Sequence, residues 1–296
     1  MKKPFINTLV ILLLIGLTAA WWAFAVAMTE LLGDAGRLVA EAVLVFAAFL
    51  MITELIMRTA DLQRRSVHDE RQLQAMFGLY ATLKPDAPIP MLRSEAISAD
   101  TALEYVRLIK QVRPNMVVEL GCGVSTILAA LQLRENGSGR VIALDDNEKL
   151  ASKTRDDLLE HQVLSLAEVR YAELKPLKVE DETARWYNPN QFADIERIDM
   201  LLINGPRDLQ DTGNRRPGLT YLSQRFSDDI VIIVDDGNRS RWRDWVHGWA
   251  KERGFVIEEP FLNEKRSMIL YRVDSVLASQ RQGMPAGSIT EPIDFG

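Results

Sequence analysis

The sequence predicts an α/β domain built around a mainly parallel sheet and preceded by a pair of membrane-spanning helices. Two segments in the middle of the chain each have an apolar strand, a polar turn and a helix in succession, which is the repeating unit of a parallel sheet. The third observation is the uncharged apolar run from Phe5 to Met28, which exceeds the roughly 20 residues that span a bilayer. The chain is therefore expected to join a membrane hairpin to an α/β domain.

Residues 1–57 are expected to form the transmembrane hairpin, with a first helix over about residues 5–28. A signal peptide is the rival interpretation, because two lysines precede the run, but its apolar core would be about twice as long as usual. The second helix covers about residues 38–57 and carries Glu41 and Glu54 near its ends, where they can reach the headgroups. A retained anchor is favoured.

The charges that flank the hairpin predict its orientation. Lysines precede it and Arg58, Arg64 and Arg65 follow it, whereas the connecting loop holds two acids and only Arg37 as a cation. By the positive-inside rule, both ends of the hairpin face the cytoplasm. The protein is expected in a membrane, the inner or plasma membrane in a bacterium, with the α/β domain on the cytoplasmic side.

Residues 58–94 are expected to form a helical stalk and a proline-rich linker. The stalk has an apolar stripe made of Leu73, Met76, Phe77, Tyr80 and Leu83. We expect the stripe to dock on the α/β domain, and pairing with a second copy, which would make a homo-oligomer, is the alternative. The domain then occupies residues 95–274, beginning with a helix capped near Ser98 or Asp100, and residues 275–296 are expected to be a disordered tail.

The first strand–turn–helix unit begins with the strand Met116–Leu120 and continues into a helix from near Ser125. Gly121 and Gly123 lack a Cβ, so a ligand can approach the turn closely, and the helix N-terminus directs N–H groups at it. Glu119 would repel a pyrophosphate but could receive a cation such as an ammonium group. Thr126 also stands where a dinucleotide-binding turn has a small residue. The pattern favours S-adenosylmethionine over NAD, and so disfavours an oxidoreductase.

A second acidic position follows the next strand, at residues 140–144. Asp145 lies roughly 20 residues beyond the glycines, where ribose hydroxyls are recognised. The alternative is that Asp145 helps to cap the following helix, but we expect Asn147 to be its cap. A third strand ends at Glu173, which would contact an adenine edge or lie in a solvated turn.

Seven segments in this order and spacing resemble class I S-adenosylmethionine-dependent methyltransferases: VVELGCGVSTI, VIALDDNEKLASKTRDDLLEH, EVRYAEL, ARWYNP, IDMLLINGP, NRRPGLTYL and IVIIVDDGNR. They look most like the small-molecule and glycan-modifying branch, over roughly residues 95–272. The resemblance implies a Rossmann-like, doubly wound, seven-stranded sheet of order 3-2-1-4-5-7-6 and transfer of the sulfonium methyl group of S-adenosyl-L-methionine. The cofactor-binding candidates are Glu119, Gly121, Gly123, Ser125, Asp145, Glu173 and Asn204.

The turn after the fourth strand departs from this family. Asn204 stands where the family usually has an aspartate. An amide accepts no proton, so the loss of a general base there would cost ~10²-fold or more in rate, and a non-catalytic domain becomes the alternative.

Asp235 and Asp236 follow the fifth strand and are the candidate catalytic residues. Metal-dependent catechol-type methyltransferases hold a divalent cation with two acids and an amide at these turns. Asn204, Asp235 and Asp236 offer the same ligand types in permuted order, which suits Mg²⁺. The favoured alternative is a plain turn after a polar strand end.

The substrate candidates lie in loops. Trp186 and Tyr187 would wall an acceptor pocket or pack internally, and Arg216 and Arg239 would grip a phosphate or carboxylate. A further set, Trp242, Trp245 and Trp249, recurs at helical spacing and is expected to be a buried helix face.

Composition argues against a nucleic-acid substrate. The chain has 41 acidic and 35 basic residues, a net charge of −6, and no dense basic stripe. We expect a membrane-anchored methyltransferase, acting on oxygen, with a small-molecule or lipid-linked polar acceptor such as a glycan hydroxyl. The alternative is a non-catalytic membrane scaffold that retains a degenerate methyltransferase fold.

Overall fold

The computed structural model describes residues 3–282, apart from 180–181, 208–212, 238 and 259–262, and only the backbone of residues 3–15 and 182. The chain divides into two compact units, Met1–His68 and Asp69–Gly296. Each is described by itself.

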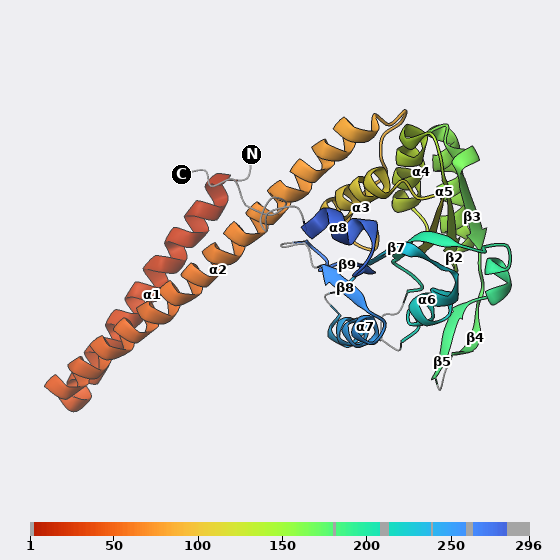
Figure 1. Cartoon of the computed structure of the whole chain (residues 1–296). Coiled ribbons are helices and arrows are strands. Elements are labelled where there is room, and N and C mark those ends of the chain that lie inside the picture. The colour runs from red at the N-terminus through yellow and green to blue at the C-terminus, as the bar shows by residue number, and fades with distance from the viewer. Residues whose placement is uncertain (1–2, 180–181, 208–212, 238, 259–262, 283–296) are drawn as a thin grey trace. The chain divides into compact units, whose positions relative to one another are not determined.

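The first unit is a pair of helices, as expected. Helix α1 (Lys3–Leu32) turns at Gly33 into helix α2 (Asp34–Leu83), and the two run side by side in opposite directions within this unit (Figure 1). They approach closely at Gly36, where a Cβ would overlap the Met28 carbonyl. Helix α2 is long and apolar enough to cross a membrane, by length and composition, and a shorter apolar helical stretch covers Gly16–Leu32. A signal sequence can meet the same criterion.

Helix α2 does not end at residue 57, so the predicted second membrane helix and the predicted stalk are one continuous element. The predicted apolar stripe divides into two faces. Leu79 and Leu83 have no exposed surface and join the core of the second unit, which confirms docking for this part of the stripe. Leu73 and Phe77, by contrast, are 60% and 74% exposed.

The second unit contains a seven-stranded sheet of order β3-β2-β1-β6-β7-β9-β8. Its strands are β1 (Met116–Leu120), β2 (Arg140–Asp145), β3 (Ala167–Tyr171), β6 (Ile198–Ile203), β7 (Phe226–Val234), β8 (Phe255–Glu258) and β9 (Met268–Arg272). The first five are parallel, and β9 lies antiparallel between β7 and β8. Counted along this sheet alone, the order is the expected 3-2-1-4-5-7-6, which is confirmed.

Helices cover both faces of the sheet, as a doubly wound fold requires. Alternate strand residues point to opposite faces, so Val117 joins one core and Val118 the other. The first core packs against the end of α2 and against α3 (Ala99–Val112), α4 (Val124–Asn136), α5 (Glu148–Glu160) and α8 (Val276–Gln282). The second packs against α6 (Pro217–Thr220) and α7 (Ser240–Glu252). Short 3₁₀ turns cover Leu164–Leu166, Pro189–Phe192 and Leu222–Arg225.

Two elements were not expected from the sequence. A hairpin of β4 (Leu174–Val179) and β5 (Glu182–Tyr187) is inserted between β3 and β6. Helix α8 occupies the start of the supposed disordered tail, and the expectation is wrong there because Leu277 is buried in the first core and Arg281 pairs with Glu104 at 2.8 Å. The rest of that predicted tail, residues 283–296, lies outside the described residues.

Candidate functional site

The glycine turn between β1 and α4 has the conformation that the sequence predicted. Gly121 and Gly123 have φ angles of +99° and +137°, a region that residues with a Cβ rarely adopt. The Gly121 N–H donates to the Leu144 carbonyl at 2.7 Å, which fixes the turn against the end of β2. The backbone is therefore bare at the carboxyl ends of β1 and β2, the place where open α/β sheets bind ligands.

Glu119 lies beneath this turn rather than on its surface. Its carboxylate accepts hydrogen bonds from the hydroxyls of Tyr105 at 2.7 Å, Ser125 at 2.9 Å and Thr126 at 2.7 Å, and the residue has no exposed surface. Burial raises the pKa of Glu119 to about 7, although the three donors oppose the shift. The carboxylate thus joins α3, β1 and α4, and the expected contact with a ligand cation stays a prediction. The hydroxyl of Ser125 is engaged in the same way.

Asp145, the last residue of β2, reaches the glycine turn as predicted. Its carboxylate accepts the N–H of Cys122 at 3.0 Å and that of Asn147 at 2.8 Å, and burial raises its pKa. Asn147 caps α5 by accepting the N–H of Lys149 and of Leu150, which confirms the predicted cap. Asp145 thus braces the turn while each of its oxygens keeps a further lone pair.

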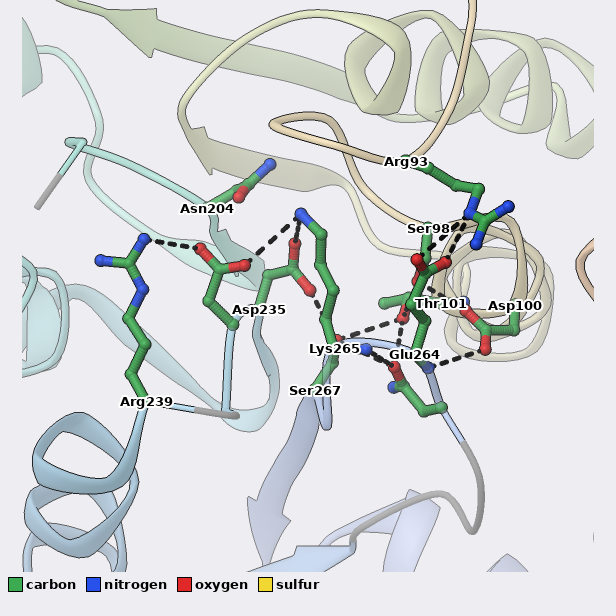
Figure 2. A network of polar contacts seen from close by, with 12 residues as sticks. Arg93, Ser98, Asp100, Thr101, Asn204, Asp235, Arg239, Glu264, Lys265 and Ser267 are labelled. Atoms are coloured by element: carbon green, nitrogen blue, oxygen red, sulfur yellow. Dashed lines mark hydrogen bonds and ion pairs between the residues drawn. The ribbon is translucent and has the colours of Figure 1, made fainter. Parts of the chain in front are cut away.

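Asn204 directly follows β6 and brings a third strand end to this place. Its N–H donates to the Leu120 carbonyl at 2.9 Å, and the next residue, Gly205, is so close that a Cβ there would lie 3.0 Å from the Gly121 nitrogen. The Asn204 side chain is partly exposed, and within the described chain its amide makes no hydrogen bond. Figure 2 accordingly draws Asn204 with no dashed line.

Tyr187 and Trp186 occupy different environments, although both are fully buried. The Tyr187 hydroxyl lies over Gly205, where a Cβ would overlap it, and it has no hydrogen-bond partner among the residues described. Burial, followed by the charge of Asp145, raises the pKa of Tyr187 well above its usual value. Trp186 instead stacks on Phe192 with ring centroids 4.9 Å apart, so it packs inside the second core and does not wall a pocket.

Asp235 is the first of the acidic pair after β7 and has no exposed surface. It receives the Lys265 ammonium at 3.2 Å and the Ser267 hydroxyl at 2.6 Å, both from the loop between β8 and β9 (Figure 2). Burial raises the pKa of Asp235, and the Lys265 charge opposes this without reversing it. The side chain is therefore enclosed by one cation and one hydroxyl.

Asp236 is surrounded by three cations. Its carboxylate lies 3.0 Å from Arg215, 3.4 Å from Lys265 and 3.6 Å from Arg239. Burial alone would raise the pKa of Asp236, but these charges outweigh it and hold the pKa below the ordinary value. The acidic pair is thus compensated within the protein.

Each of the two predicted arginines has a partner within the protein. Arg239 pairs with Asp236, and the guanidinium of Arg216 lies 5.2 Å from the ring centre of Trp245 in a cation–π contact. Glu173 is exposed, and its carboxylate lies 3.7 Å from the Lys175 ammonium. The three tryptophans of α7 are confirmed as a packed face. Trp242 and Trp249 are 3% and 4% exposed, and Trp245 stacks on Trp242.

Two residues that matter here were not among the predicted site residues, although Arg215 belongs to the basic cluster from which Arg216 was chosen. Arg215 is 4% exposed and donates to the carbonyls of Asn204 at 2.9 Å and Pro206 at 3.2 Å, besides binding Asp236. Its place directly before Arg216 and Pro217 gave a weak signal, but sequence cannot say which of two adjacent arginines turns inward. No local pattern marks Lys265.

A polar network fixes the loop that carries Lys265. Asn263 accepts the Thr101 hydroxyl at 2.9 Å and the Lys265 N–H at 3.0 Å, and the Glu264 N–H donates to Asp100 at 3.0 Å. Arg93 binds the Glu264 carboxylate at 3.0 Å (Figure 2). The loop is therefore held against the N-terminus of α3 as well as against Asp235.

No model of a known protein family matches the chain, and no curated protein matches it. Among solved structures, a methyltransferase from Geobacter sulfurreducens is 18% identical, with 69% of this chain and 90% of that one covered and a TM-score of 0.45. An O-methyltransferase from Bacillus cereus in complex with SAH is 19% identical, with coverages of 69% and 89% and a TM-score of 0.45. A putative RNA methyltransferase from Pyrococcus horikoshii is 18% identical, with coverages of 68% and 96% and a TM-score of 0.42. At these identities the likeness extends to the fold alone.

Proposed function

We propose that the chain is a membrane-anchored S-adenosylmethionine-dependent methyltransferase whose acceptor is a small or lipid-linked polar molecule, such as a glycan hydroxyl. The observation that carries this proposal is the meeting of three strand ends. The bare Gly121–Gly123 turn, the Asp145 carboxylate and the Asn204–Gly205 turn lie together through the hydrogen bonds at Leu144, Cys122 and Leu120. A nucleoside with a charged tail suits this combination.

The residues present fit such a cofactor. Asp145 uses one lone pair of each oxygen on backbone N–H groups, so two acceptor positions remain for ribose hydroxyls. The Asn204 amide is partly exposed and has no protein partner among the described residues, so it can bond polar atoms of a ligand. When bound, the cofactor supplies a methyl group on a sulfonium. The chain's own task is then to orient that group and to exclude water.

Anchoring is supported by the N-terminal helices. Their apolar composition suits a bilayer, and the excess of basic residues on both sides of the pair favours a cytoplasmic site, where the cofactor is made. An acceptor that is itself bound to the membrane would then be held near the enzyme.

A non-catalytic scaffold is the second candidate, and two observations favour it. Asn204 cannot act as a base, and Asp235 and Asp236 are engaged by Lys265, Arg215 and Arg239. A scaffold would bind the cofactor or its product without turnover.

Calorimetric titration of the full chain in a non-ionic detergent tests the proposal, with S-adenosylmethionine, S-adenosylhomocysteine and NADH as ligands. We expect the wild type to bind the first two ligands and not NADH. The Asp145→Asn variant should bind them about tenfold or more weakly than the wild type does, because the ribose loses a charged acceptor. Asp146→Asn is the matched control, since the neighbouring Asp146 is exposed and is expected to leave affinity unchanged.

Absence of binding to the folded wild-type chain would refute the cofactor assignment, and preference for NADH would replace it with an oxidoreductase. Binding without methyl transfer to any acceptor of a lipid-linked sugar panel would favour the scaffold.

A further inference from the structure

We infer that Lys265 is the resident cation of the Asp235–Asp236 pair, and that this site therefore does not take a divalent metal. The sequence offered Asn204, Asp235 and Asp236 as oxygen ligands for Mg²⁺. The structure brings a fourth group to the same place. A single ammonium lies 3.2 Å from one carboxylate and 3.4 Å from the other, so it bridges the pair as a shared metal would.

Lys265 occupies the position between the two carboxylates that a second cation would need. The residue is 8% exposed and its partner Asp235 has no exposed surface, so the Asp235 oxygens are shielded from solvent, whereas the Asp236 side chain is 15% exposed. Mg²⁺ requires oxygen ligands at about 2.0–2.1 Å in a nearly octahedral shell and gives up its waters reluctantly. It could reach these oxygens only by displacing the ammonium.

The charge balance opposes a metal as well. Asp235 and Asp236 carry two negative charges when ionised, and Lys265, Arg215 and Arg239 carry three positive ones within 4 Å of them. A divalent cation would add two positive charges to a site that already has an excess of one, in a poorly solvated place where repulsion is strong. The residues therefore do not fit the metal that the resemblance raised.

The ammonium is also held in place by its loop. Asn263 accepts the backbone N–H of Lys265, and the hydroxyl of Ser267, two residues further on, binds Asp235. Thr101 joins the same network through Asn263. Moving Lys265 away would break contacts to α3 and to β7 together, so the lysine acts as a fixed part of the site. If the chain is the methyltransferase proposed above, methyl transfer proceeds without a metal at this site to activate the acceptor.

Titration of the full chain with Mn²⁺, followed by the electron paramagnetic resonance of the free ion, tests the inference. Lys265→Met keeps an unbranched side chain of similar length but removes the charge. We expect this variant to bind Mn²⁺ at least tenfold more tightly than the wild type, because two carboxylates lose their shared cation. Lys265→Arg should match the wild type, and so should Lys251→Met, which removes an exposed lysine of α7.

Micromolar Mn²⁺ binding by the wild type that disappears in Asp235→Asn would overturn the inference. Equal affinities of the wild type and a folded Lys265→Met would overturn it too. If Lys265→Met does not fold, the wild-type titration decides alone. Absence of Mn²⁺ binding by the wild type then supports Lys265 as the resident cation. Cofactor titration of the same samples is a separate measurement, so failure of the methyltransferase proposal would leave this result readable.

Discussion

Glu119, Asp145 and Asp235 are buried carboxylates at or near the carboxyl ends of three strands of the same sheet, and each is compensated by a different kind of donor. Three hydroxyls bind the first, two backbone amides bind the second, and an ammonium with a hydroxyl binds the third. Hydroxyls and amides carry no full charge, so they offset desolvation less than a cation does. The pH dependence of the molecule should therefore centre on Glu119.

The Glu119→Gln variant tests whether the pH dependence of stability centres on Glu119. The pKa of Glu119 rises from 4.5 to about 7 on folding, so its contribution to stability is complete below pH 4.5 and is lost as pH rises through about 7. The loss is of the order of 3 kcal/mol. Urea unfolding of the full chain in detergent should show wild-type stability falling over this interval and a clearly smaller fall in the glutamine variant. Parallel pH profiles of the two proteins would contradict the assignment.

Gly205→Ala addresses the close meeting of β1, β5 and β6. A Cβ at this position overlaps the Tyr187 hydroxyl and comes within 3.0 Å of the Gly121 nitrogen, so we expect a loss of about 1–3 kcal/mol in the free energy of unfolding. Adding Tyr187→Phe should recover part of it, because one of the two contacts disappears. Gly248→Ala is the control.

Gly248 lies in helix α7 with open space where its Cβ would be, so alanine there should be neutral or stabilising. Independent, additive effects of the Gly205 and Tyr187 substitutions in chemical denaturation would show that the hydroxyl does not lie where the structure places it.

At the scale of elements, the start of α3 depends on a residue from α2. Ser98 is the N-cap residue, one of the two expected positions, but its side chain makes no capping bond. The Gln72 side-chain oxygen instead accepts the N–H groups of Ala99 at 2.9 Å and Asp100 at 3.3 Å. A helix end is thus satisfied by a different helix, which ties the two together.

Gln72→Ala should therefore lower the free energy of unfolding by about 1–3 kcal/mol, because two N–H groups in a buried place lose their acceptor. Gln74→Ala, two residues away on the exposed side of α2, should change it by less than about 0.5 kcal/mol. Thermal or urea unfolding of both variants beside the wild type measures the difference. Equal effects would mean that the capping bond contributes nothing.

The sequence predicted the elements whose signals are local. The strand before Gly121, the Asn147 cap and the α7 tryptophans depend on periodicity, a glycine turn or a side chain adjacent to its own helix, and the structure confirms them. The Gln72 cap and the Lys265–Asp235 pair join residues 27 and 30 positions apart, and nothing in either segment names its partner. Helix α8 was missed because its polar composition concealed two buried residues.

At the scale of the whole molecule, the proposed topology can be read with cysteine labelling. Cys122 is the only cysteine of the chain, and burial raises its pKa to about 12, so it should react poorly with maleimides at neutral pH. In intact cells, a membrane-impermeant maleimide should label Asp34→Cys, at the first residue of α2 beside the Gly33 turn, and should label Glu196→Cys only after permeabilisation.

The wild-type chain, whose only cysteine is Cys122, gives the background level of labelling. Labelling of Glu196→Cys in intact cells would place the α/β unit outside, and release of the chain from membranes by alkaline carbonate would contradict anchoring altogether.

The loop that carries Lys265 and Ser267 also bears on the order in which the chain is made. A ribosome releases β7, with Asp235 at its end, before it releases Lys265 and the strand β9 that enters between β7 and β8. A nascent chain that stops short of residue 265 consequently holds Asp235 without its ammonium, and the cost of burying an unpaired carboxylate opposes closing the sheet. The site is thus completed only after Lys265 and β9 have left the ribosome, and chains terminated before that point should be recognised by proteases as unfinished.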